Sequence, residues 1–150
     1  MYGLGEQDNQ DENWVKVSGV MDSGAADNVT SSDTVPHVPI RPSAGSKRGQ
    51  NFVSACGQKR ANEGEQLLQG YTDQGEEADM LMQITDVKKS LFSVKKICDR
   101  GNRVVFGRGG GVIHNLATNK LTPFRKQGGV YMMDLWIPKP NVSEGFRRQA

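Results

Sequence analysis

The chain has few cysteines, few histidines and no long apolar run. Its 150 residues hold two cysteines, Cys56 and Cys98, and two histidines, His37 and His114. The cysteines have neither the density of a disulfide scaffold nor the paired spacing of a zinc site, so we expect no metal, no cofactor and an intracellular, cytoplasmic setting. No stretch approaches the roughly 20 apolar residues that span a bilayer, so we expect no membrane contact.

Hydrophobic residues are also scarce, at 35% of the chain, whereas glycine is frequent, with 18 residues. The packed part is therefore expected to be smaller than the whole chain, and we place the excess at the two ends. Residues 1–13 are polar and acidic, unlike a signal peptide, and predict a disordered tail. Residues 138–150 contain two prolines and a basic finish, and predict a frayed end.

The charge of the chain is nearly balanced, with 19 basic and 17 acidic residues and a net charge of +2. This balance does not indicate a polyanion binder, and the basic run at residues 88–103 is typical of a solvated face. Residues 107–111 (GRGGG) have the composition of some contacts to single-stranded nucleic acid. A single copy without interleaved aromatics predicts a flexible linker instead, so nucleic acid is not expected as a partner.

The first part of the chain has the patterns of strands and turns. Residues 14–21 mix aromatic and β-branched side chains with partial alternation, which predicts a strand that ends at Asp22. Prolines between residues 31 and 50 favour a loop or an irregular edge. Residues 51–56 predict a short strand, and the turn signals that follow, up to residue 64, predict a mobile hairpin.

The second part of the chain continues with short elements. Residues 66–71 and 80–87 are apolar-rich and flank a polar loop, which predicts a hairpin, although helical spacing also fits residues 80–87. Apolar residues recur at intervals of three and four between Ser90 and Arg100, which predicts one short helix with Ser90 as a possible N-cap. Strand-like pieces follow at residues 103–106, 112–114, 120–125 and 129–137. We therefore expect an all-β chain with one short helix and with hairpins appended at the C-terminal end.

Residues Asp22–Ala25 (DSGA) come directly after the first predicted strand. An aspartate at a strand end, followed by serine and glycine, is the pattern of an aspartic protease catalytic loop. Such an enzyme uses two carboxylates a few ångströms apart that share one proton, because like charges so close do not both ionise easily. One carboxylate takes a proton from the attacking water, and the other donates to the developing oxyanion. An ordinary turn is the alternative, since aspartate, serine and glycine all favour turns.

The pattern of aspartate, serine or threonine, and glycine occurs only once in the chain. One chain therefore supplies one carboxylate, and a complete site requires two chains. A two-fold dimer brings the same residue of each chain to the symmetry axis. We therefore expect a homodimer in which the two Asp22 side chains meet, with Gly24 allowing close backbone approach and the Ser23 hydroxyl bracing the loop.

Residues Val20–Ala25 (VMDSGA) resemble the retropepsins, the retroviral-type aspartic proteases. Residues 86–97 (DVKKSLFSVKKI) and 101–106 (GNRVVF) are similar to the end of the protease in copia-type retrotransposon gag-pol polyproteins. The resemblance covers residues 14–106 and implies a small closed β-barrel. Residues 107–150 look like the segment that joins the protease to the integrase in those polyproteins.

The resemblance implies roles for the residues of the catalytic loop. Asp22 is the catalytic acid and base, and Ser23 braces the two carboxylates across the dimer. Gly24 and Ala25 form part of the floor under the substrate. Ala26 stands where retroviral proteases often hold an aspartate that binds the substrate backbone, and Asp27 substitutes for that aspartate. The implied activity is that of an aspartic endopeptidase, which hydrolyses peptide bonds of the polyprotein of its own element.

The resemblance further implies that residues 51–64 form a flap, with Gly57 or Gly64 at its tip. A flap clamps the peptide and excludes water, and a hairpin that contains glycine suits this role. A second function stays open beside the enzyme. In that alternative, the chain is a catalytically inactive remnant of the retropepsin fold that serves as a binding or assembly module.

Overall fold

The computed structural model describes residues 13–54 and 56–143 of the chain. The elements of this part follow in the order β1 (Trp14–Asp22), β2 (Val29–Thr30), α2 (Ala44–Lys47), β3 (Asn51–Val53), β4 (Lys59–Ala61), β5 (Gly64–Tyr71), β6 (Glu77–Ile84), β7 (Ser90–Ser93), α3 (Val94–Asp99), β8 (Asn102–Phe106), β9 (Gly110–Asn115), β10 (Leu121–Gln127), β11 (Val130–Pro138) and α4 (Pro140–Ser143). The chain is mostly β-sheet, as the alternating sequence patterns predict.

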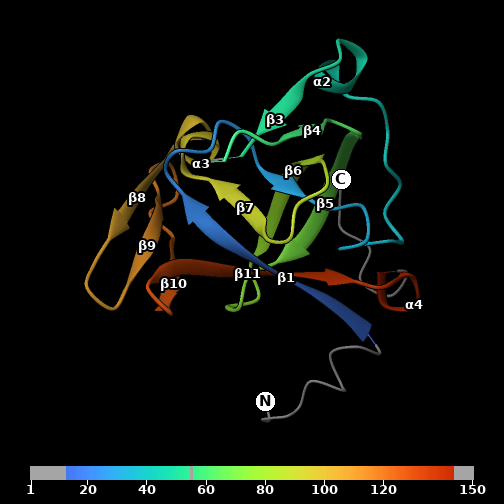
Figure 1. Cartoon of the computed structure of the whole chain (residues 1–150). Coiled ribbons are helices and arrows are strands. Elements are labelled where there is room, and N and C mark those ends of the chain that lie inside the picture. Colours follow the sequence, from blue (N-terminus) through green and yellow to red (C-terminus); the bar gives the residue numbers. More distant parts are fainter. Residues whose placement is uncertain (1–12, 55, 144–150) are drawn as a thin grey trace.

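Nine strands form one sheet in the order β1-β7-β2-β6-β5-β11-β10-β9-β8, and β1 also pairs with β11. Figure 1 shows β1 and β11 lying side by side across the molecule, with β7 on the other side of β1. Strand β7 is parallel to β1 and antiparallel to β2. The chain segment from residue 90 to 93 therefore lies between two strands that precede it in sequence by about 60 residues or more.

The core lies under β1, β5, β6, β7 and β11. In β1, every second side chain is buried, which places Val17 and Met21 in the core. Gly19 lies between them because the ring of Phe92 occupies the space beside it. A Cβ atom at Gly19 would lie 2.6 Å from the nearest ring carbon of Phe92. The fully buried Phe92 thus packs directly on the backbone of β1.

The C-terminal hairpins are not appended to the core, which corrects our expectation. Strand β11 pairs with β1 along a register that runs from Trp14 opposite Pro138 to Val20 opposite Met132. Its inward side chains are buried in the same core as those of β1 and β7: Met133, Leu135 and Ile137. The expectation was wrong because pairing between the first and last strands is a tertiary contact, which local patterns do not reveal.

The short helix is also smaller than we expected from residues 90–100. Residues Ser90–Ser93 form strand β7, and helix α3 covers only Val94–Asp99. The N-cap is Ser93, whose side chain accepts a hydrogen bond from the backbone of Lys96, and not Ser90. Pairing of β7 with both β1 and β2 supplies backbone partners and burial that outweigh the local preference for helix.

Within the described residues there are three short helices, where we expected one. Helix α2 forms in the loop predicted for residues 31–50 because Ser43 and Ser46 cap it reciprocally. The backbone N–H of Ser46 donates to the Ser43 hydroxyl at 3.0 Å, and the backbone N–H of Ser43 donates to the Ser46 hydroxyl at 2.9 Å. This serine pair makes the bonds of a capping box, in which glutamate or glutamine is the usual third residue.

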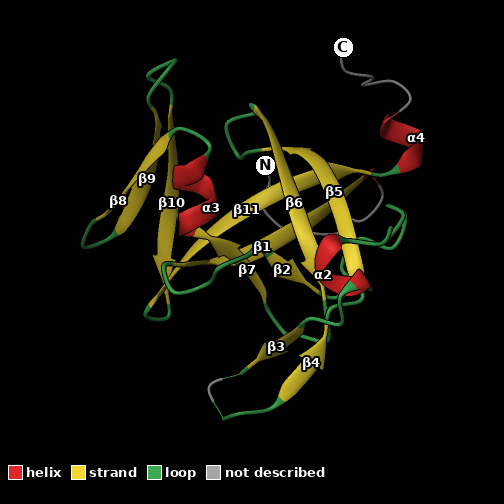
Figure 2. Ribbon diagram, turned by 90° about the horizontal axis from the view of Figure 1, so that it is seen from above, coloured by secondary structure: helices red, strands yellow, loops and turns green. Residues whose placement is uncertain are grey.

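Strands β3 and β4 form a separate two-stranded hairpin, as predicted for residues 51–64. The hairpin projects from the body of the molecule in Figure 2. Gly57 lies in its connecting turn with a φ of 85°. Gly64 does not lie at the tip, which corrects that alternative: it is buried at the start of β5, where a Cβ atom would lie 2.5 Å from the carbonyl oxygen of Arg41.

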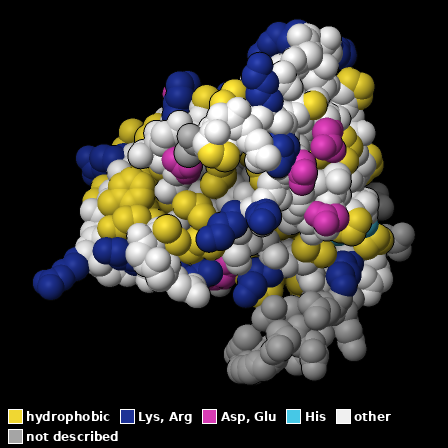
Figure 3. Space-filling model, viewed as in Figure 1, with side chains coloured by type: hydrophobic (Ala, Val, Ile, Leu, Met, Phe, Trp, Pro, Cys, Tyr) yellow, Lys and Arg dark blue, Asp and Glu magenta, His cyan; other side chains and the backbone are white. Residues whose placement is uncertain are grey.

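Exposed apolar side chains gather at the β8 end of the sheet. Val105 and Phe106 are 45% and 40% exposed, and Figure 3 shows hydrophobic side chains over this end, at the left of the view. The ring of Phe106 also contacts Phe124 and Tyr131 edge to face, with centroids 5.5 and 4.8 Å away. Strand β8 is therefore the last strand at this end of the sheet, and its Phe106 belongs to an aromatic cluster that is partly exposed to solvent.

The predicted tails lie largely outside the described residues, which exclude 1–12 and 144–150. Asn13 is described, and its carbonyl oxygen accepts a hydrogen bond from the backbone of Lys139 at 2.9 Å. Residues 140–143 form helix α4 at the beginning of the end that we expected to be frayed. No helix in the described part of the chain is long and apolar enough to cross a membrane.

Candidate active site

Asp22 is the last residue of β1, and it lies opposite Ser93 in the parallel pairing with β7. Its carboxylate oxygen Oδ1 accepts a hydrogen bond from the backbone N–H of Gly24 at 2.8 Å. This bond closes a turn in which an aspartate side chain takes the place of a backbone carbonyl. Asp22 itself is half-buried, so its carboxylate is held in place and still reachable from solvent.

The loop after Asp22 is attached to the beginning of helix α3. The Ser93 hydroxyl donates to the carbonyl oxygen of Ala25 at 2.6 Å and accepts from the backbone N–H of Lys96 at 3.1 Å. The same hydroxyl therefore caps the helix and holds the loop. Ser93 is fully buried, so both bonds are protected from competition with water.

Asn28 holds the other end of the loop. Its side-chain oxygen accepts from the backbone N–H of Ser93 at 2.7 Å, and its side-chain amide donates to the carbonyl oxygen of Leu81 at 3.1 Å. Its own carbonyl oxygen accepts from the backbone N–H of Gln83 at 2.8 Å. Only 7% of Asn28 is exposed. One side chain thus ties the loop to β7 and β6 at once.

A second polar contact lies behind the loop, at the start of β7. The hydroxyls of Thr30 and Ser90 are 2.7 Å apart and share a hydrogen bond, and Thr30 also donates to Thr34 at 2.8 Å. Thr30 is fully buried and Ser90 is nearly so. These hydroxyls satisfy one another inside the protein, which makes β2 and β7 a firm support for the loop.

The structure brings the residues predicted for the catalytic loop together on one turn, but it gives some of them other partners. Ser23 and Gly24 are exposed at the tip of the turn. The carbonyl oxygen of Ala25 bonds with Ser93 and is therefore committed to the fold. Asp27 lies 3.5 Å from Lys96 Nζ and forms an ion pair with it, instead of presenting an unpaired carboxylate to a substrate.

The two glycines predicted for the flap do not lie together. Gly57 is exposed in the β3–β4 hairpin, whereas Gly64 is buried against Arg41. Beside Gly57, the Cys56 sulfur lies 3.2 Å from the Ser54 hydroxyl. Hydrogen bonds from Ser54 and then from the backbone of Gln58 lower the pKa of the exposed Cys56 thiol. The hairpin therefore carries a thiol with more thiolate character than usual.

Sequence reasoning missed three residues that hold the loop: Asn28, Ser93 and Lys96. Ser93 could have been found as a second N-cap candidate, because it precedes the apolar positions of the helix just as Ser90 does. Asn28 and Lys96 gave no local signal. Their partners lie far along the chain, and only the insertion of β7 between β1 and β2 brings them together.

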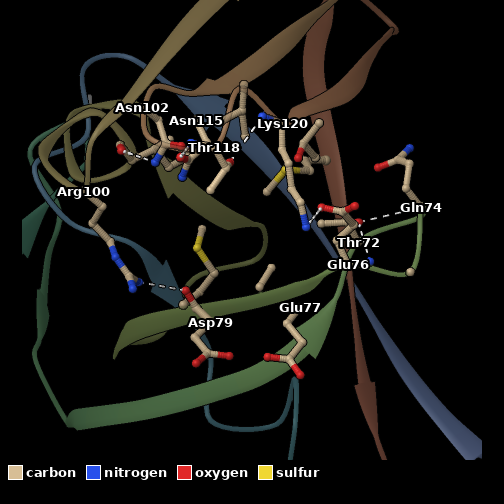
Figure 4. A pocket seen from close by; sticks show the side chains of 17 residues that line it. Thr72, Gln74, Glu76, Glu77, Asp79, Arg100, Asn102, Asn115, Thr118 and Lys120 are labelled. Atoms are coloured by element: carbon tan, nitrogen blue, oxygen red, sulfur yellow. Dashed lines mark hydrogen bonds and ion pairs between the residues drawn. The ribbon is translucent and has the colours of Figure 1, made fainter. Parts of the chain in front are cut away.

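A pocket of about 690 Å³ lies away from this loop, between the β5–β6 turn, the end of α3 and the β9–β10 hairpin. Figure 4 shows Lys120 pointing toward Glu76, with which it forms an ion pair at 3.3 Å, and Arg100 pointing toward the backbone of Asp79. Met80 and Ile113 are among its apolar lining residues. None of the predicted site residues lines this pocket, so it is separate from the Asp22 loop.

Across residues 13–54 and 56–143, the side chains of histidine, cysteine, aspartate and glutamate form no group of three or more that could hold a metal ion. The chemical groups at the Asp22 loop include the Asp22 carboxylate, the exposed Ser23 hydroxyl, backbone amides, and the ion pair of Asp27 with the Lys96 ammonium. Comparison of the chain with protein-family models, with curated proteins and with solved structures finds no match.

Proposed function

We propose that the chain is an aspartic endopeptidase that acts as a homodimer and hydrolyses extended polypeptides, such as the polyprotein of a retroelement. The observation that carries the proposal is the setting of Asp22. Its carboxylate lies at a strand end, is oriented by the Gly24 amide, and is attached through Ala25 to the capped helix α3. An aspartate in an ordinary surface turn needs no such support.

The described residues supply one such carboxylate loop in each chain, and the chemistry needs two. In the proposed dimer, Asp22 of each protomer lies at the two-fold axis, and the two carboxylates share one proton. The ionised carboxylate takes a proton from water, and the oxygen of that water forms a bond with the scissile carbonyl carbon. The protonated carboxylate donates to the carbonyl oxygen. The C–N bond then breaks as the amine nitrogen takes the proton that the first carboxylate had accepted from water, and a hydroxyl of the intermediate returns a proton to the second carboxylate as the new carboxyl group forms.

The proposal extends to the fold and the setting of the protein. Strands β1, β7, β2, β6, β5 and β11 pair in this order, with β11 joined to β5 through Trp136 and Tyr71. Strand β11 also pairs with β1, the first strand of the series. We propose that these strands form the small closed barrel of the retropepsins. The exposed, unpaired Cys56 and Cys98 support an intracellular, cytoplasmic setting.

The test is cleavage of a peptide library derived from a proteome, at mildly acid pH, read by mass spectrometry. We expect the wild type to cleave and Asp22→Asn to be inactive, because the variant keeps the shape of the side chain but not its ionisable group. Asp33→Asn is the matched control, since Asp33 is an exposed aspartate outside the Asp22 loop whose carboxylate accepts a hydrogen bond from the nearby Ser31 hydroxyl. Equal cleavage by wild type and Asp22→Asn would contradict the proposal.

A mixing experiment tests whether two chains share one site. When wild type and Asp22→Asn are mixed in equal amounts and exchange subunits, only about a quarter of the dimers carry two aspartates. We therefore expect activity per wild-type chain to fall by about half relative to the wild type alone. In an equal mixture with the active Asp33→Asn, activity per total chain should equal that of the wild type alone, whereas in the mixture with Asp22→Asn it should fall to about a quarter. If the dimer forms in sedimentation and yet does not cleave, the chain is an inactive binding or assembly module.

A further inference from the structure

Asn28 lies at the end of the Asp22 loop, where its side chain bonds with both β6 and β7. It is 7% exposed, and its side chain makes both of its bonds with backbone groups rather than with other side chains. Backbone groups of paired strands move little, so these two bonds define a position for residue 28 relative to the sheet. The five residues between Asp22 and Asn28 are therefore held at both ends, by the strand pairing of Asp22 and by the bonds of Asn28.

The partner of Asn28 is also the neighbour of Asp22. Ser93 lies opposite Asp22 in the pairing of β1 with β7, and its backbone N–H donates to Asn28. The hydroxyl of the same residue donates to Ala25, in the middle of the loop. Ser93 therefore lies opposite Asp22 and forms hydrogen bonds with both Ala25 and Asn28. The side-chain oxygen of Asn28 is the acceptor for the buried N–H of Ser93.

We infer that Asn28 is a positioning residue for Asp22: by bonding with Ser93 and Leu81 it holds the loop in the shape in which Gly24 orients the carboxylate. The expected effect of Asn28 on catalysis rests on the proposed function, whereas its effect on the shape of the loop does not. Without the Asn28 amide, the Ser93 N–H has no acceptor and the Leu81 carbonyl has no side-chain donor. The loop then relaxes toward solvent, and the turn closed by Asp22 and Gly24 opens.

Asn28 acts through Asp22 and does not touch the reacting atoms, so it differs from a catalytic residue. In the proposed enzyme, Asn28→Ala should lower kcat by about 100-fold and leave KM nearly unchanged, because misplacement of a reacting group affects the chemical step. Asn28→Asp keeps an oxygen acceptor for the Ser93 N–H and should restore part of kcat. A residue that only stabilises the fold would show no such rescue at temperatures well below its unfolding transition.

The matched control is Asn102→Ala. Asn102 bonds to the other end of α3, with its side-chain amide donating to the carbonyl oxygen of Ile97 at 2.8 Å. Asn102→Ala removes the same type of side-chain amide, here at the opposite end of α3, and leaves the bonds of the Asp22 loop in place. Both variants should unfold at lower denaturant concentration than the wild type, and only Asn28→Ala should change the loop.

The experiment measures amide hydrogen exchange of the full chain by NMR beside peptide cleavage. We expect Asn28→Ala to speed exchange at Gly24 and Ser93 by about tenfold or more beyond any change that it causes in the β5–β6 hairpin, whereas Asn102→Ala should show no such excess at these two amides. Equal exchange at Gly24 in Asn28→Ala and wild type would overturn the inference. If the exchange pattern is as expected but the wild type does not cleave, the positioning of Asp22 stands and the proposed function is wrong.

Discussion

The hydroxyl of Ser93 donates to the carbonyl oxygen of Ala25 across 2.6 Å. Residue 93 is the N-cap of helix α3, and residue 25 lies in the loop that follows Asp22, so 68 positions of sequence separate the two partners. The same hydroxyl accepts from the Lys96 backbone. The N-cap of a short helix is therefore also the anchor of the candidate active site.

Replacing Ser93 by alanine tests this double role. Ser93→Ala removes the cap of α3 and leaves the Ala25 carbonyl without its partner, so we expect unfolding free energy to fall by about 2 kcal/mol or more. Ser43→Ala removes a comparable pair of bonds, the cap of α2 and the donation from the Ser43 hydroxyl to Asn62 Oδ1 at 3.2 Å, so it should cost about as much. Urea unfolding measures both. A cost of Ser93→Ala no larger than the roughly 1 kcal/mol of a cap alone would show that the bond with Ala25 contributes nothing.

Replacing Leu135 by alanine tests whether β11 belongs to the core. Leu135 is fully buried, so Leu135→Ala should lower the unfolding free energy by about 2–5 kcal/mol. Leu121 of β10 is 60% exposed, and Leu121→Ala should change it by less than about 0.5 kcal/mol. Denaturant unfolding of the two variants decides the matter. Similar small effects would show that β11 is appended to the core, as the sequence patterns predict.

Two glycines with positive φ are expected to respond differently to alanine. At Gly64, a Cβ atom meets the backbone of Arg41, which does not move aside without breaking the pairing of residue 41 with Glu65, so Gly64→Ala should cost at least about 2 kcal/mol. Gly57 has free space around it, and Gly57→Ala should cost only the backbone strain, about 1 kcal/mol. Thermal unfolding compares the two. A larger effect at Gly57 would contradict the placement of Gly64 in β5.

The Cys56 thiol should react faster with iodoacetamide near neutral pH than an ordinary cysteine. Its pKa is lowered chiefly by the hydrogen bond with Ser54, so more thiolate is present at a given pH below the midpoint. Ser54→Ala should move the midpoint of the alkylation rate to higher pH. Rates measured against pH in a Cys98→Ser background report on this thiol alone, and an unchanged midpoint would show that Ser54 does not act on it.

Much of the local structure could be predicted from the sequence. The strand that ends at Asp22 and the turn after it were both predicted, because side-chain alternation and the preference of aspartate, serine and glycine for turns act within a few residues. The β5–β6 hairpin was predicted for the same reason, since its two strands are consecutive and joined by a polar loop. Boundaries differ by a few residues at most in these elements.

Long-range pairing could not be predicted in this way. Residues 90–93 have helical spacing, and they are a strand only because β1 and β2 offer them backbone partners on both sides. The sequence pattern of β11 predicts one more hairpin strand. Strand β11 belongs to the core only because it pairs with β1. Both decisions depend on residues that lie about 60 to more than 110 positions away.

The sequence by itself determined that Asp22 ends a strand and enters a tight turn, since this depends on neighbouring residues alone. The tertiary structure decided what supports that turn. Ser93 and Asn28 reach the loop because β7 inserts between β1 and β2, and Asp27 meets Lys96 for the same reason. A hydrogen bond acts over about 3 Å, so its partners are known only when the fold has brought them that close.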